Sequence, residues 1–273
     1  MNERIAVVIS TYNNPEFLRL VLSAYAKQGD KNFSIYIADD GSSVETREMI
    51  QGLSSTFPVP IHHVWHEDQG FRKAHIHNLT FQHITEPYII LTDGDCIPLP
   101  NMIATHRRFS EEKTMICGSR ILLSKTWTQQ LLNIESMPLY QGFDWVRLKY
   151  QKKINRLLPL FIPPYTSNIQ EKLSGIHGCH FACFKSDLFK VNGFDESFEG
   201  WGREDSDLVA RLFHIGVQRK NLRGSPVLHL WHAENSRSHL SKNDDLLKAC
   251  LDEKRQRAIK GIEENILEKD QNQ

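Results

Sequence analysis

The sequence lacks several features that would assign it to common protein classes. It has no run of about 18 apolar residues, so it predicts no membrane-spanning helix. Its N-terminal residues, MNERIAVVIS, do not have the layout of a signal peptide. Lys plus Arg and Asp plus Glu both number 33, and this balance argues against a general nucleic-acid-binding protein. The five cysteines form no Cys-x-x-Cys pair, as is typical of free thiols in a reducing compartment, and we expect a cytoplasmic protein.

What the sequence does contain is an alternation of apolar runs and helical patterns. Short runs rich in β-branched residues indicate buried strands, and the stretches between them fit helices. The alternation predicts an α/β fold with a mostly parallel sheet and helices on both faces. The expected strands lie within 4–10, 32–42, 59–70, 87–95 and 114–123, and the expected helices within 13–28, 71–83 and 100–109.

Polar and acidic residues follow four of the expected strands. These residues are Ser10 to Asn13, Asp39 with Asp40, Glu67 with Asp68, and Asp93-Gly94-Asp95. A single Asp-Gly pair is explained by a turn. In open α/β sheets, however, ligands bind at the carboxyl ends of the strands. Three acidic strand ends on one edge therefore predict a ligand site.

Asp93 and Asp95 stand on either side of Gly94 and have the chemistry of a metal site. Carboxylate oxygens suit Mg²⁺ or Mn²⁺, and a histidine ligand would favour Mn²⁺. His229 and His232 follow another apolar run. If that strand continues to residue 232, alternation turns the two rings to opposite faces, so we expect only one to bind.

A second candidate region is the segment GWGREDSD, residues 200–207. Acids in a first helical turn ordinarily complement the helix dipole, which is the simpler explanation for Glu204 and Asp205. The Gly-Trp-Gly that precedes them adds a flat aromatic face, on which a sugar ring can stack. A carboxylate beside Trp201 could then take a proton from a sugar hydroxyl as general base.

Two segments fall outside the alternation. Residues 124–176 look like an insertion, and within them 145–165 carry five basic residues and no acid. That stretch is either an amphipathic helix on a membrane surface, at the inner face of the cell membrane, or a helix packed on the domain with a solvated basic face. Ser241 and Asp244 fit a capping box for one long polar helix over about 242–268.

Five segments, taken in order, resemble family 2 glycosyltransferases of the GT-A fold. The first four, VVISTYNNPEFLRLVLSA, IYIADDGS, GFRKAHIHN and IILTDGD, resemble the nucleotide-sugar half. The fifth, GCHFACFKSDLFKVNGFDESFEGWGREDSDLVARL, resembles the acceptor half of chondroitin-polymerase-type and β-1,4-galactosyltransferase-type enzymes. The resemblance covers roughly residues 4–235 and is weakest over 124–176. It implies a mostly parallel sheet flanked by helices, with a Rossmann-like nucleotide half and an acceptor half.

The resemblance also implies a division of the chain and a set of site residues. We expect one domain over 1–240, made of a nucleotide-sugar half (1–123), an insertion (124–176) and an acceptor half (177–240), and then a C-terminal helix (241–273). The residues implied to bind the nucleotide-sugar are Thr11, Tyr12, Asn13, Asp39, Asp40, Arg72, Asp93 and Gly94. The implied acceptor-side residues are Trp201 and Gly202, with Asp205 as catalytic base and Glu204 binding a sugar. The implied metal ligands are Asp95, Asp93 and His232, because LWHAEN resembles the family's late histidine loop.

The implied activity is metal-dependent transfer of a sugar, with inversion, from a UDP-sugar to a glycan or lipid-linked glycan. By analogy the product is a bacterial surface polysaccharide such as lipopolysaccharide. One departure concerns Arg203, where related enzymes often have glycine, and it leaves the donor sugar open. Two alternatives remain. A metal-dependent nucleotidyltransferase or nucleotide-sugar hydrolase would release free sugar without acceptor, and a non-catalytic sugar-binding relative would fail to bind UDP and metal.

Overall fold

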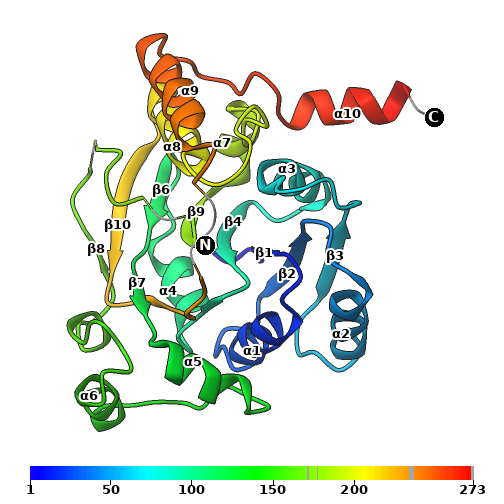
Figure 1. The fold of residues 1–273 in the computed structure, drawn as a ribbon. Coiled ribbons are helices and arrows are strands. Elements are labelled where there is room, and N and C mark those ends of the chain that lie inside the picture. Colours follow the sequence, from blue (N-terminus) through cyan, green and yellow to red (C-terminus); the bar gives the residue numbers. More distant parts are fainter. Residues whose placement is uncertain (171, 177, 234–236, 272–273) are drawn as a thin grey trace.

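The computed structural model describes residues 1–170, 172–176, 178–233 and 237–271. In this part of the chain an eight-stranded sheet forms the centre (Figure 1). Its first four strands are all parallel, as predicted, whereas β9 runs antiparallel to both of its neighbours. The strand order is β3 (Ile61–Trp65), β2 (Phe33–Asp39), β1 (Ile5–Thr11), β4 (Tyr88–Asp93), β9 (His180–Phe184), β6 (Thr114–Cys117), β10 (Gln218–Arg223) and β8 (Tyr165–Thr166).

A smaller three-stranded sheet lies beside it, made of β5 (Cys96–Ile97), β11 (Val227–His229) and β7 (Arg120–Leu122). The prediction of one strand over 114–123 is therefore wrong, because β6 and β7 belong to different sheets. The chain leaves β6 at Gly118, where a β-carbon would lie only 2.0 Å from His180 Nδ1. Glycine lets the backbone pass against β9 at this point before it turns into the second sheet.

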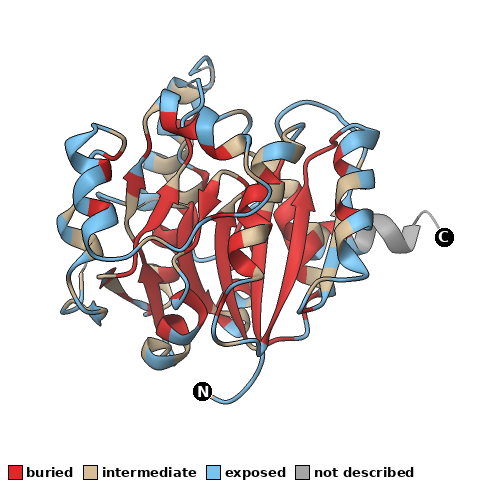
Figure 2. Cartoon of the chain, turned by 90° about the horizontal axis from the view of Figure 1, so that it is seen from below, coloured by how far each residue is buried: buried red, intermediate tan, exposed pale blue. Residues whose placement is uncertain are grey.

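Helices cover both faces of the large sheet, as the alternation predicted. Ile5, Val7 and Ile9 of β1 pack with α1 on one face, and Ala6 and Val8 pack with α3 on the other. Figure 2 shows the strands as a buried band between helices whose outer faces are exposed. The helices of residues 1–123 are α1 (Pro15–Tyr25), α2 (Val44–Ser54), α3 (Lys73–His83) and α4 (Met102–Phe109).

The expected insertion, apart from residue 171, which lies outside the described residues, folds as short elements packed on the domain. These are α5 (Lys125–Leu132), α6 (Phe143–Tyr150), the 3₁₀ turn η1 (Leu158–Leu160) and β8. The basic stretch 145–165 is thus not one helix. Helix α6 ends at Tyr150, and Lys152 adopts a left-handed φ of 57°, which an α-helix does not accommodate. Trp145 and Leu148 anchor α6 in the core.

The C-terminal region contains two helices where one was predicted. After α7 (Lys185–Lys190) and α8 (Glu204–His214), the chain forms α9 (Leu240–Asp252) and α10 (Ile262–Gln271). Lys254 breaks the helix with a φ of 50°, and the N-cap of α9 is His239, so the expected capping box at Ser241 is not formed. The sequence predicts that one stripe of this region, Leu247, Cys250, Ala258 and Ile262, packs on the domain; the last three are buried and Leu247 is half-buried. None of the described helices is long and apolar enough to cross a membrane.

Candidate active site

A cleft of about 1020 Å³ opens where the carboxyl ends of β1 and β4 face the start of α8 and the end of β11. The loop after β4 approaches β1 closely, because Gly94 N donates to Ser10 O at 2.8 Å. A β-carbon on Gly94 would lie 3.1 Å from that oxygen. Of the predicted site residues, those that line the cleft are Thr11, Tyr12, Asp40, Asp93, Gly94, Asp95, Trp201, Gly202, Glu204, Asp205 and His232.

Asp93 lies at the floor of the cleft in a tight polar cluster. Its Oδ1 accepts hydrogen bonds from Ser10 Oγ at 2.8 Å and from Lys73 Nζ at 2.7 Å. Burial alone would raise the pKa of this carboxyl, but the adjacent Lys73 ammonium lowers it to about 2. Asp93 is therefore ionised at neutral pH and paired with a cation.

Lys73 follows Arg72 in the segment GFRKAHIHN, and of these two basic residues it is Lys73 that lines the cleft. The Arg72 guanidinium instead donates to Gln69 Oε1, and Arg72 does not line the cleft. Arg72 directly precedes α3 and Lys73 is its first residue. In a helix, successive side chains point about 100° apart. The segment GFRKAHIHN contains both residues, but only the packing of α3 shows that Lys73 faces the cleft.

Asp39 and Asp40 take different positions although they are adjacent. Asp39 is fully buried, accepts a hydrogen bond from Ser42 N, and lies 2.8 Å from His63 Nε2. Asp40 lines the cleft, lies 2.9 Å from His66 Nε2, and accepts a bond from Arg72 N. Strand alternation separates the two carboxylates, so Asp40 faces the ligand space and Asp39 supports the loop beneath it.

Tyr12 and Asn13 directly follow strand β1. Tyr12 is half exposed and donates to Asp68 Oδ2 at 2.9 Å. Asn13 has a left-handed φ of 46°, and its side-chain oxygen accepts a bond from Ser43 N. Tyr12 thus offers an aromatic face to the cleft, whereas Asn13 shapes the loop and does not line the cleft.

Asp95, His229 and His232 bring three metal-ligand atoms together. Asp95 Oδ2 lies 3.1 Å from His232 Nε2 and 3.7 Å from His229 Nε2, and the three donor atoms lie within 4.8 Å of one another. The condition for the two rings to face opposite ways is not met, because β11 ends at His229 and strand alternation does not extend to residue 232. The hydrogen bond to Asp95 raises the pKa of His232 to about 9. Residues 234 and 235, which end the LWHAEN motif, lie outside the described part.

The donor set of this cluster, one carboxylate oxygen and two imidazole nitrogens without a thiolate, suits a divalent transition metal such as Mn²⁺ better than Mg²⁺, which prefers oxygen ligands. Asp93, predicted as a third ligand, is not part of it. Its carboxylate instead groups with the thiols of Cys96 and Cys179 and is paired with Lys73. The two aspartates of the Asp-Gly-Asp triplet therefore face different neighbours.

The acceptor-side acids stand at the start of α8. Asp205 Oδ2 accepts a hydrogen bond from Gly178 N at 3.0 Å, and a β-carbon on Gly178 would lie 2.2 Å from that carboxylate. Glu204 Oε2 accepts a bond from Gly202 N at 3.0 Å. Asp207, in the same helical turn, forms a buried ion pair with Arg211 at 2.7 Å and belongs to the core. Only the first two acids of the motif thus reach the cleft.

The charges of the two halves meet at Lys73. Burial opposes its ammonium, but the carboxylates of Asp93, Asp205 and Glu204 raise its pKa well above the usual range. Burial raises the pKa of Asp205, against the opposing effect of Lys73. Burial, and then the charge of Asp205, raises the pKa of Glu204 to about 7. Two acids with elevated pKa values in a cleft are typical of acid–base chemistry.

Aromatic faces line the outer part of the cleft. Trp201 is 40% exposed, and the Arg237 guanidinium lies 5.6 Å from its ring. Its loop is fixed by α9, whose Asn243 side chain donates to Gly202 O at 2.8 Å. Trp231, 42% exposed, also lines the cleft and was missed in the sequence. Its position directly before His232 was the available signal.

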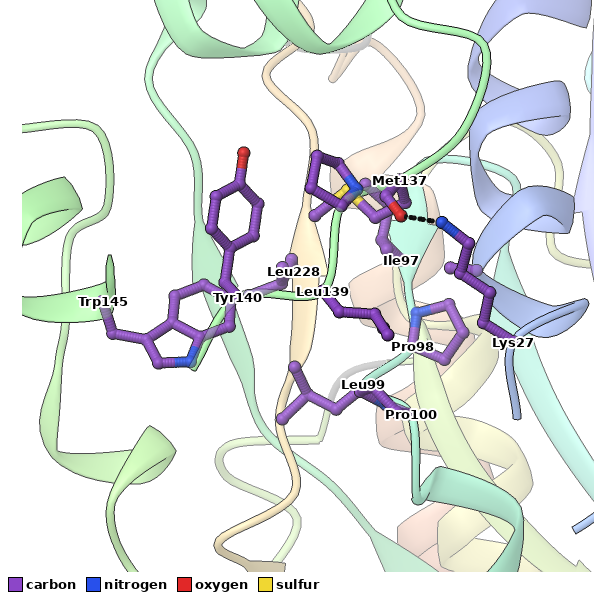
Figure 3. A pocket seen from close by; sticks show the side chains of 12 residues that line it. Lys27, Ile97, Pro98, Leu99, Pro100, Met137, Leu139, Tyr140, Trp145 and Leu228 are labelled. Atoms are coloured by element: carbon purple, nitrogen blue, oxygen red, sulfur yellow. Dashed lines mark hydrogen bonds between the residues drawn. The ribbon is translucent and has the colours of Figure 1, made fainter. Parts of the chain in front are cut away.

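A second, small pocket lies away from these groups (Figure 3). Its lining is mainly apolar and includes Pro98, Leu139 and Trp145, and Lys27 Nζ donates to Met137 O at 2.5 Å beside it. It holds only about 20 Å³, too little for a sugar. The pocket results from the packing of the insertion on the loop after β5.

Comparison with known proteins gives two family matches. Residues 6–188 match the model of glycosyl transferase family 2, and residues 161–233 match the N-terminal domain of galactosyltransferase. Chondroitin synthase of Escherichia coli is 23% identical over 239 residues, covering 82% of this chain and 34% of the relative. Validoxylamine A glucosyltransferase of Streptomyces hygroscopicus subsp. limoneus is 25% identical over 260 residues, covering 90% and 55%. The chain thus spans about a third to a half of the length of these relatives.

Solved structures share the fold at low identity. The crystal structure of S. aureus TarS superposes with a TM-score of 0.61 at 13% identity, covering 90% of this chain and 39% of TarS. The mannosyltransferase PcManGT from Pyrobaculum calidifontis, in complex with GDP-Man and Mn²⁺, gives a TM-score of 0.56 at 14% identity, covering 84% and 57%.

Proposed function

The chain belongs to glycosyl transferase family 2 and has the GT-A fold, and from this premise we propose that it transfers a sugar from a nucleotide-sugar to a hydroxyl of a glycan. The proposed donor is a UDP-hexose or UDP-N-acetylhexosamine. TarS has also been solved in complex with UDP, whereas PcManGT was solved with GDP-Man, so the nucleotide itself needs a test. Its relatives include chondroitin and hyaluronan synthases, which supports a polysaccharide or lipid-linked glycan as acceptor.

One observation carries the proposal. A single cleft holds a paired carboxylate and ammonium, Asp93 with Lys73, a metal-ligand cluster at Asp95, and a half-buried carboxyl of raised pKa, Asp205. A nucleotide-sugar needs cationic groups at its diphosphate, and an acceptor hydroxyl needs a base. A simple sugar-binding module would not need a general base.

The proposed donor site uses the edge formed by β1, β2 and β4. Thr11, Tyr12 and Asp40 line the space for the nucleoside, and Lys73 lies where the diphosphate charge would be met. Both hydrogen bonds to Asp93 go to Oδ1, which leaves Oδ2 as the proposed contact to ribose or metal. In this proposal Lys73, rather than Arg72, binds the diphosphate.

Asp95, His229 and His232 would hold the divalent cation, and the two imidazoles favour Mn²⁺ over Mg²⁺. When bound, such a cation offsets the negative charge that develops on a leaving nucleoside diphosphate. His232 must release its proton to become a ligand, because its lone pair is otherwise occupied.

The proposed reaction is a single displacement. Asp205 accepts the proton of the acceptor hydroxyl, whose oxygen attacks the anomeric carbon as the bond from that carbon to the diphosphate oxygen breaks. Attack from the face opposite the leaving group inverts the anomeric configuration. Glu204 and Trp201 hold the sugars, Glu204 by hydrogen bonding and Trp201 by stacking.

The direct test incubates the protein and Mn²⁺ with a panel of nucleotide-sugars and glycan acceptors. We expect release of nucleoside diphosphate that depends on acceptor, and a product of inverted anomeric configuration by NMR. Free sugar released at the same rate without acceptor would instead establish a nucleotide-sugar hydrolase. Retained configuration would exclude the single displacement.

A further inference from the structure

Helix α6 carries apolar residues on two opposite faces. In an α-helix, positions 143, 146 and 150 share one face, and positions 145 and 148 lie on the other. Trp145 and Leu148 are buried and anchor the helix. Phe143 and Tyr150 are 90% and 89% exposed, and Val146 is 42% exposed. The helix therefore turns a second apolar stripe, not needed for folding, toward the outside.

The chain that follows carries further exposed apolar residues and adds charge. Leu158, Phe161 and Tyr165 are exposed, Leu158 by 70%. The one acid between residues 136 and 170 is Asp144. Against it stand five basic residues, Arg147, Lys149, Lys152, Lys153 and Arg156. Because the whole chain has a net charge of zero, this positive surplus is local.

The basic aromatic segment is joined to the wall of the cleft. Asn155 pairs with Leu122 twice, through its side-chain oxygen at 2.9 Å and its N–H at 3.1 Å, and Ile154 forms a β-bridge with Leu123. Leu122 and Leu123 line the cleft. Figure 1 places α6 at the opposite end of the molecule from α10. A surface that contacted this segment would lie next to the cleft.

We propose that the face formed by residues 143–165 docks on an anionic lipid bilayer, where the protein meets a lipid-linked acceptor. Exposed aromatic and aliphatic side chains enter the headgroup region, and Lys and Arg are attracted to anionic lipids. The docking face stands on its own observations, while the lipid-linked acceptor rests on the proposed glycosyltransferase function.

A second copy of the chain fits this face less well than a bilayer. A two-fold symmetric dimer brings the same patch of both subunits together, so the five cations would face five identical cations. An anionic bilayer instead neutralises them while it accepts Phe143 and Tyr150.

Co-sedimentation of the full chain with vesicles tests the proposal. We expect binding to vesicles of phosphatidylcholine with phosphatidylglycerol, little binding to phosphatidylcholine alone, and weaker binding at high salt. Absence of binding to the anionic vesicles, or equal binding to both compositions, would overturn it.

Paired variants locate the contact. The double substitution Phe143→Ser/Tyr150→Ser should weaken vesicle binding about tenfold or more, since two exposed aromatic rings lose their burial in the headgroups. Arg147→Gln/Lys152→Gln should weaken it by a similar factor. Ile259→Ser is the control, because Ile259 is 57% exposed and lies in the segment between α9 and α10. Unchanged binding in the aromatic variant, or an equal loss in the control, would overturn the assignment.

Two further measurements separate the rival outcomes. Sedimentation velocity that shows a dimer lost in Phe143→Ser/Tyr150→Ser would assign the face to a second copy and overturn the bilayer proposal. The thermal shift with nucleotide and Mn²⁺ should be the same in this variant as in the native chain. Vesicle binding without any nucleotide shift would leave the docking face standing and remove the proposed function.

Discussion

At the residue scale, Lys73 connects the two halves of the cleft. Its ammonium pairs with Asp93 on the donor side, and its charge also acts on Asp205 and Glu204 on the acceptor side. A buried cation needs such partners, because the loss of its hydration would otherwise cost several kcal/mol. On the proposed function, a bound diphosphate would supply further negative charge to Lys73, and Lys73 would help to bind the donor.

Asp205→Asn is the sharpest test of the proposed base. Asparagine keeps the shape of the side chain and an oxygen for the Gly178 N–H, but it cannot accept a proton at neutral pH. A general base contributes about 10²–10⁴-fold, so turnover should fall by that factor while nucleotide binding stays nearly constant. Steady-state assays and calorimetric titration measure the two quantities. The exposed Asp252→Asn controls for loss of one charge, and native turnover in Asp205→Asn would rule out this base.

Glu204→Gln tests the electrostatics through pH. The pKa of Glu204 is raised by burial and by Asp205 from 4.5 to about 7, so between these values the folded chain holds a proton that the unfolded chain has lost. The native protein therefore loses stability as pH rises through that window, whereas glutamine has no proton to lose. The melting temperature of the variant should gain on that of the native chain between pH ~5 and ~8. Parallel curves from thermal denaturation would contradict the assigned pKa.

At the element scale, α10 returns to pack against the nucleotide half. Ile262 is buried at its start among Ile76, Phe81 and Val191, whereas Ile266, one turn later, is 40% exposed. Asn265 Nδ2 donates to Glu196 Oε1 at 2.6 Å and strengthens the contact. The packing of α10 therefore stabilises the nucleotide half.

Ile262→Ala should lower the free energy of unfolding by about 2–5 kcal/mol, because it leaves a cavity in this cluster. Ile266→Ala, the same chemical change at an exposed position, should alter it by about 0.5 kcal/mol or less. Urea denaturation followed by circular dichroism measures both. Equal effects of the two substitutions would show that α10 is not held by its buried end.

The elements of the nucleotide half were predictable because local signals agree with the fold. Asn14 caps α1 and Pro15 is its first residue, within the predicted range 13–28, and the apolar runs form buried strands. The predictions of elements failed where residues distant in the sequence determine the path of the backbone. Gly118 turns the chain against His180, and Gly261 passes Asn192 so closely that a β-carbon would lie 1.9 Å from its carbonyl oxygen. No local pattern contains those neighbours.

In the candidate site too, some residues could be predicted from the sequence and others could not. Asp95, Asp205 and Trp201 were found from their motifs, and all three line the cleft. The sequence could not show that Lys73 rather than Arg72 reaches the cleft, since that depends on how α3 packs. Nor could it show that His229 and His232 both approach Asp95, because this follows from where β11 ends.

At the scale of the whole molecule, the cleft and the segment 143–165 differ in charge although the formal net charge of the chain is zero. The cleft is lined by five carboxylates together with Lys73, Arg120, Arg203 and Arg237, whereas the segment 143–165 carries five basic residues and one acid. The two regions share the wall at Leu122 and Leu123. On the proposed function, the donor would bind in the cleft and the acceptor would be presented at the surface beside it.

The most direct test of this account is a thermal-shift measurement with UDP, GDP, dTDP and CMP, each with and without Mn²⁺. A ligand that binds only the folded chain raises its melting temperature. We predict that one nucleotide, UDP first among them, raises it only with Mn²⁺, and that Asp95→Ala abolishes this shift. No shift with any nucleotide, or one that persists without Mn²⁺ and in Asp95→Ala, would contradict a metal-dependent glycosyltransferase site in this cleft.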